Sequence, residues 1–178
     1  MPRLFVALNL PGDVGEEISR LCCGLAGARW ADPMQLHLTL GFIGDTDGLL
    51  ARHITDELRT VTAPSFSMRL QGMGHFPPGG KPRILWVGVE KNKNLKLLHK
   101  KIGSTLRRVG LRGPQRKFIP HITLARLRNC SPAKLAAFLA ANSMFRSREF
   151  MVEDFHLYSS ILSPKGARHL IESSYPLA

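Results

Sequence analysis

The sequence predicts an α+β fold, with two pseudo-symmetric lobes of antiparallel sheet and the helices packed outside. Three observations support this prediction. Along the 178 residues, strand-like segments, in which every second residue is apolar, are interspersed with segments whose apolar residues recur at helical spacing. Their order corresponds to β-α-β-β-α-like units. Two strand-like runs, 65–75 and 83–89, flank a loop rich in Pro and Gly and are typical of a hairpin. The pattern His-apolar-Thr-Leu occurs twice, at 37–40 and 121–124, which indicates duplicated half-domains.

The first half of the chain is expected to hold two strands and two helices. A run rich in Leu, Val and Phe forms the first strand, which Pro11 and Gly12 end. Asp13, with Glu16 three residues later, is expected to cap a helix whose apolar residues recur at helical spacing. The first motif strand and a second amphipathic helix follow. The expected ranges are 3–10, 13–25, 35–43 and 47–60.

The second half is expected to hold the hairpin, a long basic helix, the second motif strand, a short helix and a final strand pair. Gly110 ends the long helix, and Ser131 with Pro132 is typical of a helix start. No linker or low-complexity segment interrupts the chain, so we expect residues 1–178 to form a single domain of two similar lobes. After the hairpin, the expected ranges are 94–109, 121–128, 131–141, 145–160 and 167–174, with a turn at 164–166.

The charge of the chain favours an anionic partner. Lys and Arg number 25 against 13 Asp and Glu, which gives a formal net charge of +12. Ten basic residues and no acidic residue lie between Lys91 and Lys117. We expect this segment to form a positive face near the second motif, although the solvated side of a helix accounts for part of it. This charge implies a polyanionic partner, although a basic protein can also simply be soluble.

The cysteines and the apolar runs favour a reducing, cytoplasmic compartment. Cys22 and Cys23 are adjacent, which disfavours a disulfide between them, and no cysteine has the spacing of a zinc site. The apolar run at 4–8 is too short for a secretory signal, and no run approaches the length that spans a membrane. We expect a monomer with no membrane partner.

Each motif places one imidazole and one hydroxyl on the same side of a strand. Side chains in a strand alternate faces, so His37 shares a face with Thr39, and His121 shares a face with Thr123. If the strands are neighbours, these groups meet in an arrangement that suits cleavage of a phosphodiester without a metal. One neutral His takes a proton from water, and one charged His gives a proton to the leaving oxygen. Arg126 is a further candidate for substrate binding, although strict alternation turns it away from the histidines unless the strand bulges.

The same alternation makes predictions for nearby residues. Phe42 is expected to face the core with the leucines that precede it. Gly41 is expected on the histidine face, where it leaves room for a ligand. Of the other histidines, His53 beside a helical apolar stripe is expected to be structural, and His75 at the edge of the Pro-Gly loop is a weaker candidate for substrate contact.

Three alternative functions are open. An RNA-binding module without chemistry would explain the charge but not the recurrence of His-x-Thr. A phosphodiesterase for a small cyclic nucleotide or a 2′-5′ oligoadenylate would use the same residues. A metal site is disfavoured, because two histidines without a paired carboxylate or Cys form a poor ligand set. We therefore expect no metal and no cofactor.

The chain resembles the two-histidine (2H) phosphoesterase superfamily over its whole length, and within it the RNA 2′,3′-cyclic phosphodiesterases, also called 2′-5′ RNA ligase-like proteins. The two His-x-Thr motifs in their flanks carry the resemblance. One departure is visible, since the family tends to carry Tyr where this chain has His169. The matching segments are 3–8, 37–44, 83–89, 118–126, 158–160 and 176–177.

This resemblance implies an active cleft between the two lobes and hydrolysis of a 2′,3′-cyclic phosphate at an RNA end to a 2′-phosphate. It implies that His37 is the general acid, that His121 is the general base, and that no metal takes part. Thr39 and Thr123 are then expected to hydrogen-bond the non-bridging oxygens of the phosphate. Reversal of a related transfer would join a cyclic end to a 5′-hydroxyl, so RNA ligation is chemically open to the same site.

Overall fold

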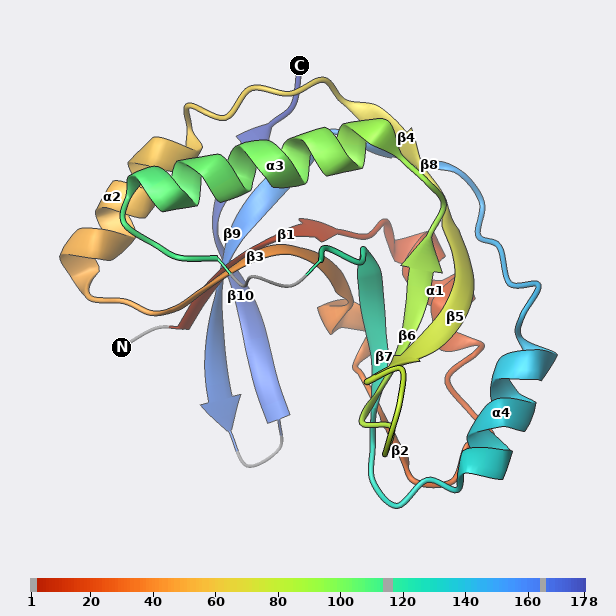
Figure 1. Cartoon of the computed structure of the whole chain (residues 1–178). Coiled ribbons are helices and arrows are strands. Elements are labelled where there is room, and N and C mark those ends of the chain that lie inside the picture. The colour runs from red at the N-terminus through yellow and green to blue at the C-terminus, as the bar shows by residue number, and fades with distance from the viewer. Residues whose placement is uncertain (1–2, 114–116, 164–165) are drawn as a thin grey trace.

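The structure is a computed structural model that describes residues 3–113, 117–163 and 166–178. Within them, eight strands form one antiparallel sheet in the order β10-β9-β1-β3-β7-β6-β5, with β2 paired to β7, and β4 pairs with β8 (Figure 1). The predicted α+β class with antiparallel pairing is confirmed. The strands are β1 (Arg3–Asn9), β2 (Ala28–Trp30), β3 (His37–Asp45), β4 (Phe66–Met68), β5 (Leu70–Phe76), β6 (Ile84–Val89), β7 (His121–Leu127), β8 (Phe150–Val152), β9 (Asp154–Ser163) and β10 (Gly166–Pro176).

The two motif strands join the two halves of the main sheet. β3 belongs to the half that holds β1, β9 and β10, and β7 belongs to the half that holds β5 and β6. The two strands pair only at Leu38 and Ile122, and both side chains are fully buried. Away from this pair the two halves diverge, as Figure 1 shows. The residues that flank this pair are therefore the ones that the two halves can share.

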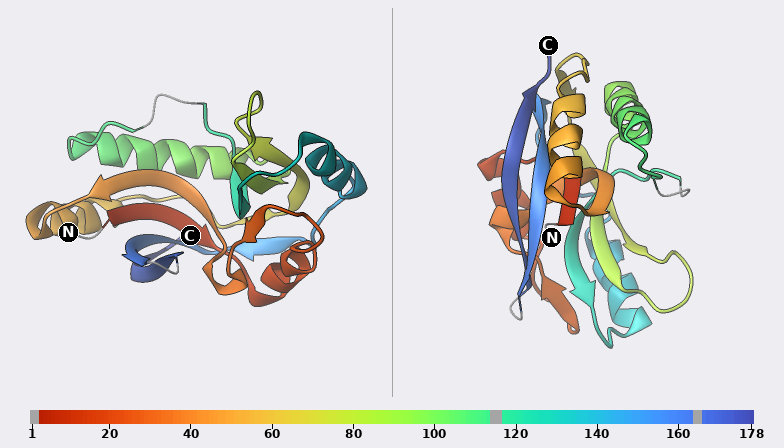
Figure 2. Two further views of the ribbon diagram at one scale, coloured as in Figure 1. Left: turned by 90° about the horizontal axis from the view of Figure 1, so that it is seen from below. Right: turned by 90° about the vertical axis from the view of Figure 1, so that its left-hand side faces the viewer.

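The described residues form four α-helices and one short 3-10 helix. They are α1 (Gly12–Ser19), the short 3-10 helix η1 (Pro33–Gln35), α2 (Gly48–Leu58), α3 (Lys93–Arg108) and α4 (Pro132–Ala141). Figure 2 shows α3 running alongside β3, and the buried side of α3 carries Leu95, Leu98, Ile102 and Leu106. α4 packs on the other half through Phe138, whose ring lies 5.9 Å from that of Trp30.

Near the start of the chain, the structure corrects the predicted end of the first helix and the predicted capping role of Asp13. α1 ends at Ser19 rather than at residue 25, because the following chain turns through Gly24 and Gly27, both with positive φ. Asp13 does not cap α1; its carboxylate forms an ion pair with Arg148 instead. Residues 164 and 165 of the expected turn, and 114–116 of the basic segment, lie outside the described residues.

A β-bulge in β3 overturns the predictions for Phe42 and Gly41. Opposite β1 the register skips Leu40, so the alternation of side chains shifts by one residue beyond it. Phe42 is consequently 66% exposed rather than part of the core. Gly41 faces α3, where an added Cβ would lie 3.1 Å from the Leu106 side chain. The glycine therefore allows close packing of a helix and leaves no room for a ligand.

Candidate active site

His37 begins β3, immediately after η1. The Asp32 side chain accepts a hydrogen bond from the backbone N–H of Met34 and fixes the start of η1. The Nδ1 atom of His37 lies 2.8 Å from the carbonyl oxygen of Gln35. A carbonyl only accepts, so Nδ1 carries the proton in this contact and Nε2 is left for proton exchange.

His121 begins β7 in the same local arrangement. Its Nδ1 atom lies 2.7 Å from the carbonyl oxygen of Ile119, again two residues earlier in the chain. The same reasoning leaves Nε2 of His121 for proton exchange. The repeated motif therefore repeats the tautomer of its histidine as well as the sequence.

The register of the two strands brings the four motif side chains together. Leu38 pairs with Ile122, so continuing the antiparallel register by one residue each way sets His37 opposite Thr123 and Thr39 opposite His121. All four flanking side chains are partly exposed, whereas the paired apolar side chains are buried on the other face. We call the face that carries His37, Thr39, His121 and Thr123 the motif face.

Aromatic rings support both imidazoles, and the sequence analysis did not identify this role. The Phe5 ring lies 4.9 Å from that of His37 and stacks on Tyr158 at 5.1 Å. The Phe76 ring lies 4.9 Å from that of His121 in an edge-on contact. These contacts restrict the imidazoles to orientations that the carbonyl hydrogen bonds already favour.

A third histidine, His169 of β10, also lies against His37. The two rings are 4.9 Å apart and nearly perpendicular. The backbone N–H of His169 donates to the side-chain oxygen of Gln35 at 2.6 Å. Gln35 therefore holds His37 with its carbonyl and β10 with its side chain. The departure at His169 from the family pattern was the only signal in the sequence for this contact.

The surroundings of His37 favour its neutral form. The pKa of His37 is lowered to about 4, mainly by burial. The hydrogen bond to Gln35 opposes this change, and the charges of His169 and His121 contribute to it. At neutral pH the imidazole of the free protein is therefore uncharged. The effect of His121 on this pKa also shows that the two motif imidazoles interact electrostatically.

Arg126 lies on the motif face, in contrast to what strict alternation predicts. β7 bulges at Leu124, which has no partner on β6. Beyond the bulge Arg126 pairs with Ile84, which shares one face of β6 with Trp86. The Trp86 ring lies 6.1 Å from that of His121, so this is the face of the histidines. Arg126 is exposed there and makes no ion pair within the described residues.

Three other histidines lie apart from this constellation. His53 is exposed on α2, rather than half-buried as a structural residue would be. His75 pairs with the buried Leu85, so it faces away from Phe76 and from the motif face. His99 stacks on Phe118 at 3.7 Å. Within the described residues, no cluster of three His, Cys, Asp or Glu side chains is arranged to hold a metal ion.

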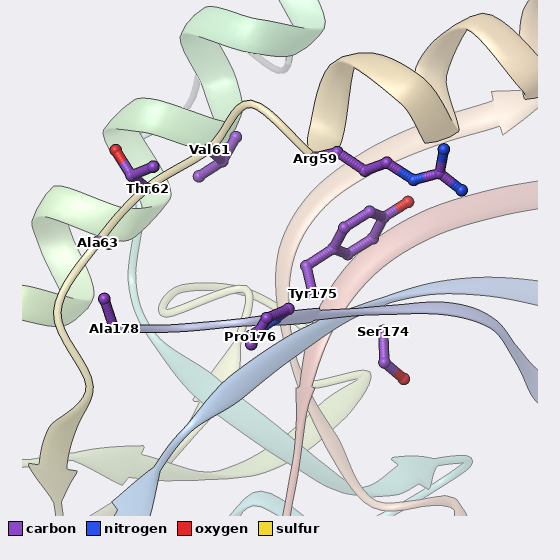
Figure 3. A pocket seen from close by; sticks show the side chains of 8 residues that line it. All are labelled: Arg59, Val61, Thr62, Ala63, Ser174, Tyr175, Pro176 and Ala178. Atoms are coloured by element: carbon purple, nitrogen blue, oxygen red, sulfur yellow. The ribbon is translucent and has the colours of Figure 1, made fainter.

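A hollow in the surface lies away from the motif residues, at the end of β10 (Figure 3). Its one charged side chain, Arg59, is paired with Asp56 at 3.0 Å. The Tyr175 hydroxyl donates to the carbonyl of Thr55 at 3.2 Å. The charge of Arg59 is paired and the Tyr175 hydroxyl is hydrogen-bonded, so the side chains that line the hollow offer no unpaired positive charge to an anionic substrate. Its lining residues are Arg59, Val61, Thr62, Ala63, Ser174, Tyr175, Pro176 and Ala178.

An antiparallel α+β fold whose two central strands each present a histidine and a threonine on one face defines the two-histidine phosphoesterase class. Solved structures share this fold over nearly the whole chain. TT0787 of Thermus thermophilus matches with a TM-score of 0.82 and 26% identity, over 98% of this chain and 97% of that one. The structure of Escherichia coli LigT complexed with 3′-AMP matches with a TM-score of 0.82 and 25% identity, over 100% and 99%.

Sequence comparisons give the family. The family model described as the 2′-5′ RNA ligase superfamily matches residues 11–162. A protein of Archaeoglobus fulgidus named RNA 2′,3′-cyclic phosphodiesterase is 32% identical, over 92% of this chain and 94% of its own length. A protein of Thermotoga maritima with the same name is 33% identical, over 92% and 89%. This chain belongs to the 2′-5′ RNA ligase superfamily.

None of the helices within the described residues is long and apolar enough to cross a membrane.

Proposed function

We propose that this protein hydrolyses the 2′,3′-cyclic phosphate at an RNA end to a 2′-phosphate. The observation that carries the proposal is the register of β3 and β7, which gathers two imidazoles and two hydroxyls on one face. Relatives that share up to 33% of the sequence are named RNA 2′,3′-cyclic phosphodiesterase. The net charge of +12 suits a polyanionic substrate.

In the proposed reaction, the neutral His121 takes a proton from a water molecule through Nε2. The oxygen of that water attacks the phosphorus, opposite the bond to the 3′ oxygen. That bond breaks, and the protonated His37 gives its Nε2 proton to the 3′ oxygen, which leaves as a hydroxyl. One proton has then moved from water to His121 and one from His37 to the product. Exchange with solvent restores both histidines.

Thr39, Thr123 and Arg126 are the proposed substrate-binding residues. Neither threonine makes a side-chain hydrogen bond within the described residues, so both hydroxyls can donate to the non-bridging oxygens. Arg126 adds a positive charge to the same face. Donors placed where negative charge develops stabilise a transition state more than they stabilise the bound substrate.

The proposed mechanism requires that substrate binding raise the pKa of His37, which is low in the free protein. An acid must be protonated, and a pKa of about 4 leaves His37 neutral at pH 7. A phosphate anion bound on the motif face is expected to raise this pKa by about 1 to 3, the effect of an opposite charge at close range. NMR titration of the histidine rings, without and with adenosine 2′-phosphate, measures the change.

In that titration the exposed His53 serves as the internal control, because its ring signals are expected not to change when the ligand binds. If the ligand bound and left the pKa of His37 near 4, His37 would be better suited to the base role. The two assignments would then have to be exchanged.

Product analysis tests the proposed function directly. An RNA oligonucleotide with a 2′,3′-cyclic phosphate is incubated with the protein, and the terminal phosphate is assigned by phosphorus NMR. We expect a 2′-phosphate and a free 3′-hydroxyl. Binding without any product would support an RNA-binding module instead, and a 3′-phosphate would contradict the proposed bond cleavage. Parallel assays with a nucleoside cyclic phosphate, a 2′-5′ oligoadenylate and a 5′-hydroxyl acceptor separate the related activities.

A further inference from the structure

The exposed side of α3 carries a row of basic residues. At 3.6 residues per turn, these residues lie within about 60° of one another, opposite the buried side of the helix. They span about 21 Å, since each helical residue adds about 1.5 Å along the axis. We call this row the α3 stripe. Its members are Lys93, Lys96, Lys100 and Arg107, and all four side chains are exposed.

The fold does not use the charges of the three lysines in the α3 stripe. None of them makes a hydrogen bond or an ion pair within the residues that the structure describes. Two other basic residues of α3, by contrast, attach the helix to its neighbours. Arg108 is paired with Glu57 at 3.2 Å, and the Lys101 side chain donates to the carbonyl oxygen of Thr62. The lysines of the stripe are therefore open to a ligand from outside the chain.

The α3 stripe destabilises the helix that carries it. Lys93 begins α3 and no acidic residue lies in the first turn, although the N-terminus of a helix favours negative charge. Lys96 and Lys100 are four residues apart, a spacing at which like charges on a helix repel. α3 contains no Asp or Glu, so no pair of opposite charges along the helix offsets this repulsion. A polyanion bound along the stripe would remove both unfavourable effects, whereas a helix face that is only solvated gains nothing from this arrangement.

The helix that carries the stripe also contacts the segment that leads into β7. The ring of His99, on α3, stacks on that of Phe118 at 3.7 Å, and Phe118 lies three residues before His121 (Figure 1). Its neighbour Lys117 is exposed and makes no ion pair in the described part of the chain. Unpaired positive charge therefore extends from α3 to the segment that enters the second motif strand.

We propose that the α3 stripe, together with Lys117, is a docking surface for the phosphate backbone of an RNA chain. An anionic membrane fits less well, because the apolar side of α3 is buried in the core and cannot enter lipid. α3 packs against Gly41 on the buried face of the sheet, opposite the motif face. An RNA whose end lies on the motif face therefore reaches the stripe only if it is several nucleotides long. This inference rests on the proposed function for the identity of the ligand.

Binding of a long and a short ligand to a stripe variant tests the docking surface. The ligands are a single-stranded RNA oligonucleotide that ends in a 2′-phosphate, and adenosine 2′-phosphate alone. A variant that combines Lys93→Gln, Lys96→Gln and Lys100→Gln is expected to bind the oligonucleotide about 3- to 100-fold more weakly, the range for three exposed charge contacts. It is expected to bind adenosine 2′-phosphate as the wild-type protein does. The slope of log affinity against log salt concentration is expected to become shallower by about 2, since each contact with a single strand contributes about 0.7.

A control variant removes three exposed basic residues from other parts of the chain, by Arg20→Gln, Arg52→Gln and Lys134→Gln. Its net charge equals that of the stripe variant, and it is expected to keep the affinity and the salt dependence of the wild-type protein. The stripe variant is expected to unfold at a slightly higher temperature than the wild-type protein, because the repulsion along α3 is relieved. Thermal unfolding followed by circular dichroism measures this change.

Equal weakening of oligonucleotide binding in the two variants would mean that net charge alone sets the affinity, and it would overturn the docking surface. An unchanged salt slope in the stripe variant would overturn it as well. Loss of binding to vesicles that contain phosphatidylserine, with RNA binding unchanged, would indicate a membrane-facing surface instead. Hydrolysis of adenosine 2′,3′-cyclic phosphate is expected to be equal in the wild-type protein and the stripe variant. Absence of hydrolysis in every protein would overturn the proposed function, whereas the binding comparison would still decide on the docking surface.

Discussion

Replacing either His37 or His121 with Ala is expected to lower kcat on a cyclic-phosphate RNA end by about 10²- to 10⁴-fold, the contribution of a general acid or base. His37→Ala removes the proposed proton donor, and His121→Ala removes the proposed proton acceptor. The hydrogen bonds to the carbonyls of Gln35 and Ile119 hold the rings but do not bind substrate, so affinity is expected to change much less. Single-turnover rates and equilibrium binding of the RNA measure the two effects separately.

The double variant is expected to be only slightly slower than the worse single variant, because residues that act on one transition state are not additive. His53→Ala is the matched control, since it removes an exposed imidazole from α2 and is expected to keep full activity. Near-normal turnover by His37→Ala would contradict the two-histidine mechanism. A large loss of affinity with an unchanged kcat would reduce the histidines to binding residues.

The fold class was predictable because the elements follow local rules. Apolar periodicity gave β1, α2, α3 and β7 to within about two residues of their observed bounds, the usual uncertainty of element ends. The sequence does not predict that β3 and β7 are neighbours; it predicts a shared site only if they are. Their adjacency depends on a single pair of buried residues far apart in the chain, Leu38 and Ile122, and no local pattern specifies such a pair.

The errors near the site have one physical cause. Strict alternation in a strand assumes that each residue has a partner, and the bulges at Leu40 and Leu124 each leave one residue without a partner. The first bulge moves Phe42 out of the core, and the second returns Arg126 to the motif face. Both follow from how β3 and β7 fit their neighbours, so they could not be read from either strand alone.

The residues that contact His37 could not be predicted from local sequence patterns, for a different reason. Phe5, Gln35 and His169 come from three separate segments, and they meet because β1 lies between β3 and the β9–β10 hairpin. A backbone carbonyl, such as that of Gln35, carries no signal in the identity of its residue. The sequence could therefore identify the reacting groups but not the groups that orient them.

Replacing Thr39 or Thr123 with Val is expected to lower kcat by about 10²- to 10³-fold, the loss found when one donor to a developing oxyanion is removed. Valine keeps the size and branching of threonine, and the side chains are partly exposed, so the fold is expected to tolerate the change. Thr→Ser at the same position restores the hydroxyl and is expected to recover most of the activity. Steady-state kinetics of seven proteins measure the contributions: wild type, the two Thr→Val variants, the two Thr→Ser variants and the two His→Ala variants.

The two kinds of variant differ in a way that identifies the role of the hydroxyls. Donors that act mainly in the transition state change kcat and kcat/KM together, whereas donors that only hold the substrate raise KM. The pH dependence of the threonine variants is expected to match that of the wild-type protein, because no titrating group is removed. The pH–rate profile of the wild-type protein is expected to be bell-shaped, because one histidine must be charged and the other neutral. Each histidine variant is expected to lose one limb of that profile. If Thr→Val raised KM alone, the hydroxyls would position the phosphate without stabilising its transition state, and the histidines would have to provide most of the rate enhancement.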